Sequence, residues 1–173
     1  MQRVIRSLSW WCAMAGGALF GIVVLVTVIN VGGFILNAVA RLADRTVPGL
    51  PGYEDAVSLL VGLGALLMLP WCQLQRGHVS VDLFTSLLSD RALRRLTRVT
   101  DAVMGCLAGF LAVMLVRGTL SYRADGVRTP VLEWLVWPFM LPGAAAIALW
   151  AAVAFYLAAR PEALDDRPAS GGD

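Results

Sequence analysis

The sequence contains no lysine and only one histidine, His78, and just 15% of its 173 residues are charged. All 14 basic residues are arginines, and 12 acidic residues leave a formal net charge of +2. Binding of nucleic acid requires a basic stripe on a water-exposed face, so this near-neutral balance argues against it. One histidine is also too few for a haem held by two axial histidines.

Recognisable catalytic and metal-binding motifs are missing as well. The three cysteines, Cys12, Cys72 and Cys106, lie within apolar runs, and their spacing fits neither a zinc site nor a CxxC motif. We interpret them as small apolar side chains packed between helices. The sequence has no P-loop, and no acidic residue lies at the centre of an apolar run, where a proton-coupled carrier would need one. We therefore predict no catalytic, cofactor or metal site, and we do not expect an enzyme.

Hydrophobic residues, by contrast, make up 58% of the chain, and the mean hydropathy is +0.73. A soluble domain of this length cannot bury so much apolar surface in its core, so the excess must face lipid. Three apolar runs are long enough to cross about 30 Å of hydrocarbon as helices, and a shorter one, the third along the chain, can do so only together with its polar flanks. We predict an all-α integral membrane protein with a single membrane domain and four transmembrane helices, at approximately residues 11–38, 55–75, 99–121 and 134–159.

The first apolar run follows two arginines, which is also the pattern of a secretory signal peptide. No charge interrupts residues 7–40, and this run is too long for a cleavable signal, so we predict an uncleaved helix. Gly17 and Gly21 form a small-xxx-small pair that predicts a close contact between helices. Asn30 lies deep in the same run and is expected to bond either to a partner helix or within this chain.

The other runs carry polar or helix-breaking residues at informative places. Glu54 and Asp55 open the second run, where acidic side chains complement the positive end of the helix dipole. The third run is free of charge for only 15 residues, between Asp101 and Arg117. Those two side chains must therefore lie near the membrane interfaces or face protein. Residues 142–143, Pro-Gly, predict an interruption in the first third of the fourth helix.

One polar stretch, Leu74–Asp82, separates the second and third runs. Apolar residues then recur at helical spacing, which predicts a short amphipathic surface helix at approximately residues 80–89. His78 is interpreted in three ways: as a proton-sensing or ligand residue, as a contact to a partner subunit or lipid headgroup, or as an interfacial helix cap. Four arginines follow, which we interpret as an orientation signal in contact with anionic lipid or as a docking surface for another protein: Arg91, Arg94, Arg95 and Arg98.

The distribution of arginines also predicts the orientation in the membrane. With the N-terminus in the cytoplasm, nine arginines fall on the cytoplasmic side and five on the outer side. The positive-inside rule therefore favours cytoplasmic N- and C-termini and places Leu74–Asp82 on the cytoplasmic face. Residues 161–173 are polar and are predicted to form a disordered tail.

Residues 10–159 resemble the small, four-span membrane subunit of tripartite ATP-independent periplasmic (TRAP) transporters. The most specific part of the resemblance is a run of matching residues, Arg76, Gly77, His78, Val79, Val81, Asp82 and Leu83. Weaker matches are Tyr53, Glu54 and Asp55, the pair Gly62 and Gly64, the segment Arg91–Arg95, and Pro142-Gly143. The sequence departs from the family pattern at Ser80, where a basic residue is common, and at Tyr53, where tryptophan is common.

The resemblance implies a scaffold subunit of a secondary transporter that is driven by an ion gradient and imports an organic acid. The implied partners are a large multi-span membrane subunit, which would carry the substrate and sodium sites, and a periplasmic substrate-binding protein. The implied location is the bacterial inner membrane, where anionic lipids would be further partners. Two alternatives are the small four-span subunit of a tripartite tricarboxylate transporter, which lacks the Gly-His-Val-x-Val-Asp stretch, and the membrane anchor of a redox complex, which needs more histidines.

Reversal of two charges tests the role of the arginine cluster. In the double variant Arg94→Glu/Arg95→Glu we expect impaired topology or assembly, because positive charge flanking a span determines its orientation. Substrate affinity is expected to stay unchanged. The measurements are the level of assembled complex in membranes and binding-protein-dependent uptake. Altered substrate preference at a normal level of complex would contradict this role.

Overall fold

The computed structural model describes residues 2–43, 49–75 and 90–159. The regular structure in these ranges is helical and consists of α1 (Gln2–Ala40), the short 3-10 helix η1 (Arg41–Ala43), α2 (Tyr53–Leu74), α3 (Asp90–Ala124) and α4 (Trp137–Ala159). The four α-helices are all long and apolar enough to cross a membrane, which confirms the prediction of an all-α membrane protein. The amphipathic helix expected at residues 80–89 and the tail expected at 161–173 lie outside the described residues.

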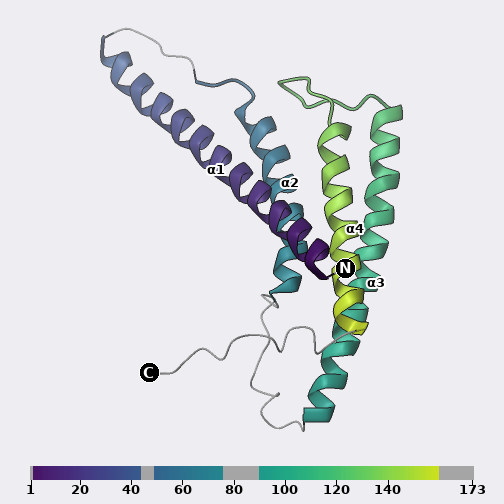
Figure 1. Ribbon diagram of the computed structural model, residues 1–173. Coiled ribbons are helices and arrows are strands. Elements are labelled where there is room, and N and C mark those ends of the chain that lie inside the picture. Colours follow the sequence, from purple (N-terminus) through teal and green to yellow (C-terminus); the bar gives the residue numbers. More distant parts are fainter. Residues whose placement is uncertain (1, 44–48, 76–89, 160–173) are drawn as a thin grey trace, which may run out of the picture.

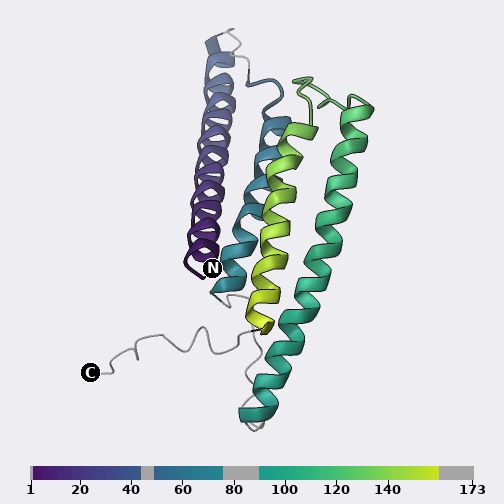
Figure 2. The same cartoon turned by 45° about the vertical axis from the view of Figure 1, so that its right-hand side comes forward.

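The four helices stand in a row in the spatial order α1, α2, α4, α3 (Figures 1 and 2). Successive helices run in opposite directions, so the bundle has two distinct ends. At the proximal end α1 and α3 begin and α2 and α4 finish. At the distal end α1 and α3 finish and α2 and α4 begin. The start of α3 extends past the other helices at the proximal end (Figure 1).

Two of the helices are longer than a bilayer requires. α1 has 39 residues and α3 has 35, which correspond to about 58 Å and about 52 Å at the standard helical rise. Because the hydrocarbon layer is about 30 Å thick, both helices must tilt or extend beyond it. In Figure 1, α1 is strongly inclined to α2. The first nine residues of α1 contain no proline or glycine, which explains why the helix begins well before the expected span.

The contact between α1 and α2 is closest at Gly16. A Cβ atom on Gly16 would lie 2.8 Å from the backbone oxygen of Gly64 in α2. The pair Gly17 and Gly21 does not make this contact with α2: a Cβ on Gly21 would have no atom of the described chain within 4 Å, and one on Gly17 would only touch the Met68 methyl group at 3.8 Å. Small-residue spacing identifies a helix face but cannot show which face meets a partner when the helix is apolar all round.

Asn30 of α1 is buried within the chain, with 2% of its surface exposed. Its Oδ1 atom has no hydrogen-bond partner in the part of the chain that the structure describes. A Cβ on Gly49 would lie 3.7 Å from Oδ1, so the segment leading into α2 packs against this amide. Among the described residues, this atom therefore does not make the bond within the chain that we considered for Asn30.

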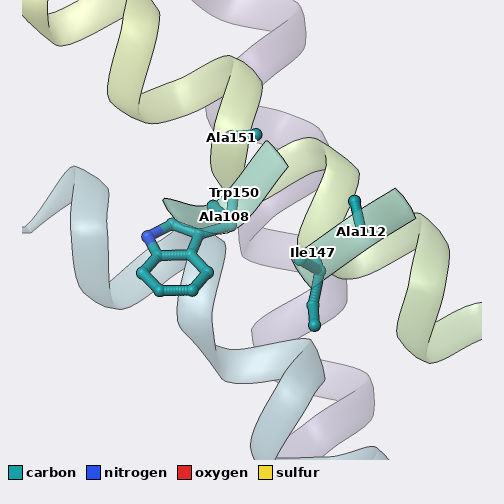
Figure 3. Packing of buried hydrophobic residues seen from close by; sticks show 5 residues of the cluster. All are labelled: Ala108, Ala112, Ile147, Trp150 and Ala151. Carbon is teal, nitrogen blue, oxygen red and sulfur yellow. The ribbon is translucent and has the colours of Figure 1, made fainter. Parts of the chain in front are cut away.

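The core lies where α3 and α4 pack together beside α2. Figure 3 shows the central cluster, with two alanines from α3 facing Ile147, Trp150 and Ala151 of α4. The α3 alanines are Ala108 and Ala112. Alanines at a helix contact let the backbones approach closely, which is the usual basis of packing in membranes. In the most apolar part of α4, 50% of the residues are buried, against 6% in α1. The apolar surface of α1 must therefore contact lipid or another protein.

The predicted interruption of the fourth helix is wrong, because α4 is continuous through Pro142. Pro142 is the sixth residue of α4, and the hydrogen bond that it cannot make would reach back only to Pro138 in the first turn. The loss of this single bond leaves the remaining turns intact. Gly143 serves in packing instead, since a Cβ there would lie 2.8 Å from Cδ1 of Leu66 in α2.

The contact at Gly16 can be tested with a matched pair of variants. Gly16→Ala and Gly21→Ala gain the same helix propensity, but only Gly16→Ala introduces a methyl group against a backbone oxygen. We expect Gly16→Ala to be less stable than Gly21→Ala by about 1–3 kcal/mol, the usual cost of overpacking. Thermal unfolding of the two variants in the same detergent measures the difference. Equal unfolding temperatures would show that α1 and α2 do not meet at Gly16.

Candidate functional site

A chain of three buried polar side chains links α2, α3 and α4 at the proximal end. The Nε2 atom of Gln73 in α2 donates a hydrogen bond to Oδ1 of Asp101 in α3, at 2.9 Å. The indole Nε1 of Trp150 in α4 donates to Oε1 of Gln73, at 3.1 Å. The three side chains are 3%, 6% and 6% exposed, in the order Gln73, Asp101, Trp150. One glutamine amide therefore bonds to both α3 and α4.

The chemistry of each group explains the arrangement. An amide carries both a donor and an acceptor, so Gln73 can serve a carboxylate on one side and an indole on the other. A carboxylate on a membrane-spanning helix is costly unless it faces protein and is hydrogen-bonded. Asp101 was expected to lie near an interface or to face protein, and it faces protein. Arg117, the other charge that bounds the apolar part of α3, is exposed.

A second link ties the helices together at the distal end. Oδ2 of Asp55, in the first turn of α2, accepts hydrogen bonds from the backbone N–H groups of Val131 at 2.8 Å and Leu132 at 2.9 Å. These two residues belong to the loop 125–136 that joins α3 to α4. Asp55 was expected only to complement the dipole of its own helix. It also holds the loop that joins α3 to α4, the two helices on the side of α2 opposite to α1.

The loop 125–136 has a regular internal structure. Backbone N–H of Thr129 donates to the carbonyl of Trp134 at 2.9 Å, and N–H of Trp134 donates back to Thr129 Oγ1 at 3.1 Å. The N–H of Val136 donates to the carbonyl of Val127 at 3.2 Å. Because Trp134 is held in this hairpin, α4 begins at Trp137 and not near residue 134 as expected.

Glycine is required where α2 meets this loop. Gly52 has a φ of 76° and immediately precedes α2. A Cβ atom there would lie 2.7 Å from Cγ of Leu132. Both the left-handed backbone and the lack of space exclude larger residues. At the start of α2, Gly52 therefore leaves room for the loop and Asp55, three residues later, binds it.

The residues singled out from the sequence fall into two groups. Glu54 is exposed in the first turn of α2, beside Asp55. The arginine cluster is exposed along the first turns of α3, the part that extends past the other helices: Arg91, Arg94, Arg95 and Arg98. The four residues of the motif stretch lie outside the described residues: Arg76, Gly77, His78 and Asp82. Among the described residues of these groups, Glu54 and the four arginines, none is hydrogen-bonded to the Gln73 network.

The described polar groups are suited to holding helices together. In residues 2–43, 49–75 and 90–159, no three His, Cys, Asp or Glu side chains are grouped so that they could hold a metal ion. All three cysteines are free thiols, and Cys106 is exposed on α3. Gln73 and Trp150 were missed in the sequence, where they were counted as parts of apolar runs. The sequence carries no signal for Gln73, because the buried stripe of Gly64, Leu67 and Pro70 that it continues is visible only in the structure.

The Asp55 link can be tested against its neighbour. Asp55→Ala removes the acceptor for two loop amides, whereas Glu54→Ala removes the same charge from the same helical turn. We expect severalfold faster hydrogen exchange at Val131 and Leu132 in Asp55→Ala and unchanged exchange in Glu54→Ala. Exchange measured by mass spectrometry on the detergent-solubilised chain reports both amides. Equal exchange in the two variants would show that the carboxylate does not hold the loop.

Comparison with known proteins identifies the family. Residues 31–161 match the family described as tripartite ATP-independent periplasmic transporters, DctQ component. This range contains α2, α3, α4 and the last part of α1. No curated protein and no solved structure matches the chain. Because the match covers well over half of the sequence and agrees with the four apolar helices, the chain belongs to the DctQ component family of the tripartite ATP-independent periplasmic transporters.

Proposed function

We propose that this chain is a fixed scaffold in a binding-protein-dependent transporter that imports an organic acid and is driven by an ion gradient. Membership in the DctQ component family indicates the small subunit of a TRAP transporter. The family also implies association with a large membrane subunit and with a substrate-binding protein. The substrate class and the ion coupling are parts of the proposal.

The observation that carries the scaffold role is the hydrogen bonding at both ends of the helix row. Gln73 joins α2 to α3 and α4 at the proximal end, and Asp55 joins α2 to the α3–α4 loop at the distal end. Helices bonded at both ends resist sliding against each other. A domain that carries substrate across a membrane must instead move as a unit against a stationary partner. A body linked in this way is suited to be the stationary partner.

The surface of α1 supports association with a larger membrane protein. Most residues of α1 are exposed, and the exposed ones include Val24, Leu25, Val28 and Ile35. We propose that part of this surface contacts the large subunit and that the rest contacts lipid. In the proposed orientation both termini are cytoplasmic and the membrane is the bacterial inner membrane. The distal loop 125–136 then faces the periplasm, where a substrate-binding protein acts.

The scaffold role predicts how loss of the Gln73 network affects transport. Gln73→Leu removes both inter-helix hydrogen bonds and leaves a buried indole N–H without its acceptor, at a cost of about 1–3 kcal/mol. We expect a lower yield of complex and a maximal uptake rate that falls in proportion, with the half-saturating substrate concentration unchanged. The control is Ser58→Leu, which makes the same kind of change at an exposed position of α2.

The measurement uses the chain co-expressed with its large subunit, purified and reconstituted in proteoliposomes with the substrate-binding protein. Uptake of a panel of labelled carboxylates is followed with and without a sodium gradient. We expect uptake only when all three components and the gradient are present. A change in substrate preference at full complex yield would contradict the scaffold role. A chain that purifies from its native membrane as a stable monomer would contradict association with the large subunit.

A further inference from the structure

A groove opens at the proximal end between the first turns of α1 and the last turn of α2. Its volume is about 480 Å³. It is lined by four residues from α1 and two from the end of α2, namely Arg3, Arg6, Ser7, Trp10, Trp71 and Gln75. The groove does not include any residue of the Gln73 network or of the distal loop.

The lining residues form two facing walls. On α1, Arg3 and Ser7 are one turn apart, and so are Arg6 and Trp10, so all four lie along one side of the helix. On the opposite side, Trp71 and Gln75 are one turn apart at the end of α2. The groove thus combines two guanidinium groups, a hydroxyl, an amide and two indoles.

The groove has a strongly positive character. Both of its charged side chains are arginines, and no acidic residue lines it. Within the part of the chain that the structure describes, neither Arg3 nor Arg6 is paired with a carboxylate. The first turn of α1 contains no acidic residue, so the positive end of the helix dipole adds to the same field.

We propose that this groove binds a phosphate group, carried either by an anionic phospholipid or by free phosphate. Guanidinium groups are planar and donate paired hydrogen bonds to phosphate oxygens, and two of them supply enough positive charge for either a phosphodiester or free phosphate. The Ser7 hydroxyl and the Gln75 amide supply further donors. Tryptophans such as Trp10 and Trp71 are enriched at the depth of lipid headgroups, which places the groove at that depth.

The surroundings of the groove also suit a ligand with acyl chains. Met14, one turn beyond Trp10, is 53% exposed, and the apolar surface of α1 continues past it. The α1 wall of the groove lies before residue 31, where the family match begins. The other wall, formed by Trp71 and Gln75, lies within the matched range.

The test uses the full-length chain, purified and stripped of lipid in detergent. Native mass spectrometry measures binding of dioleoyl phosphatidylglycerol, with dioleoylglycerol as the control that has the same acyl chains and no phosphate. A separate titration calorimetry experiment measures binding of inorganic phosphate. The variant is Arg3→Gln/Arg6→Gln, and the matched control is Arg41→Gln/Arg117→Gln, which removes the same charge from exposed positions outside the groove and outside the arginine cluster of α3. Circular dichroism and gel filtration establish that each variant is folded.

We expect phosphatidylglycerol to bind and dioleoylglycerol not to bind. The Arg3→Gln/Arg6→Gln variant is expected to lose at least about tenfold in affinity, because two charge-assisted contacts are removed, and the control is expected to bind like the wild type. Binding of phosphatidylglycerol alone identifies a lipid site, and arginine-dependent binding of inorganic phosphate as well identifies a site for free phosphate. Absence of binding in both experiments, or equal losses in the variant and the control, would overturn the proposal.

A second variant keeps the test decisive if the double glutamine variant does not fold. Arg3→Lys/Arg6→Lys preserves the charge and removes the planar fork of donors. A severalfold loss of affinity in this variant supports a site built for phosphate. Wild-type affinity would show that the groove only attracts anions by its charge and would overturn the site.

Discussion

The arrangement of α2, α3 and α4 depends on the two hydrogen bonds of the Gln73 amide. Asp101 lies on the helix with the most charge and the shortest apolar run, and it would be costly in a membrane without a polar partner. Gln73 provides that partner and is in turn bonded by the Trp150 indole. Hydrogen bonds between membrane helices are individually worth only about 0.6–1.7 kcal/mol. Their directionality, however, selects one rotation of each helix among many apolar packings of similar energy.

Much of the fold could be predicted from the sequence, because a helix that crosses lipid needs apolar side chains over a long stretch of chain. A run of about 20 apolar residues is sufficient to indicate a spanning helix, and α2 and α4 follow directly from such runs. The rotation of each helix could not be predicted, because an apolar helix has no polar face to orient it. This is why Gly17 and Gly21 were chosen when Gly16 makes the contact. Pro142 was misjudged because its missing bond falls in the first turn of α4.

The candidate site was less predictable than the fold, since its contacts join distant parts of the chain. Asp55 lies 76 residues before Val131, and no local pattern predicts that its carboxylate would accept the amides of that loop. Composition identified Glu54 and Asp55 only as acidic residues at a helix start. The motif Arg76–Asp82 indicated the protein family by its resemblance, and it did not indicate any contact. Gln73, three residues before that motif in the sequence, is hydrogen-bonded to Asp101 of α3.

The start of α3 extends past the other helices, and the buried Asp101 determines how far it extends. Because the carboxylate is bonded to Gln73, the lengthwise position of α3 is set against α2. Arg98 and Arg91 then lie about 4.5 Å and about 15 Å farther along the helix axis, by the standard rise per residue. One buried hydrogen bond at the proximal end therefore determines how far the exposed arginines stand from the apolar layer. Substitution of Gln73 would therefore shift the exposed arginines of α3 relative to the membrane surface.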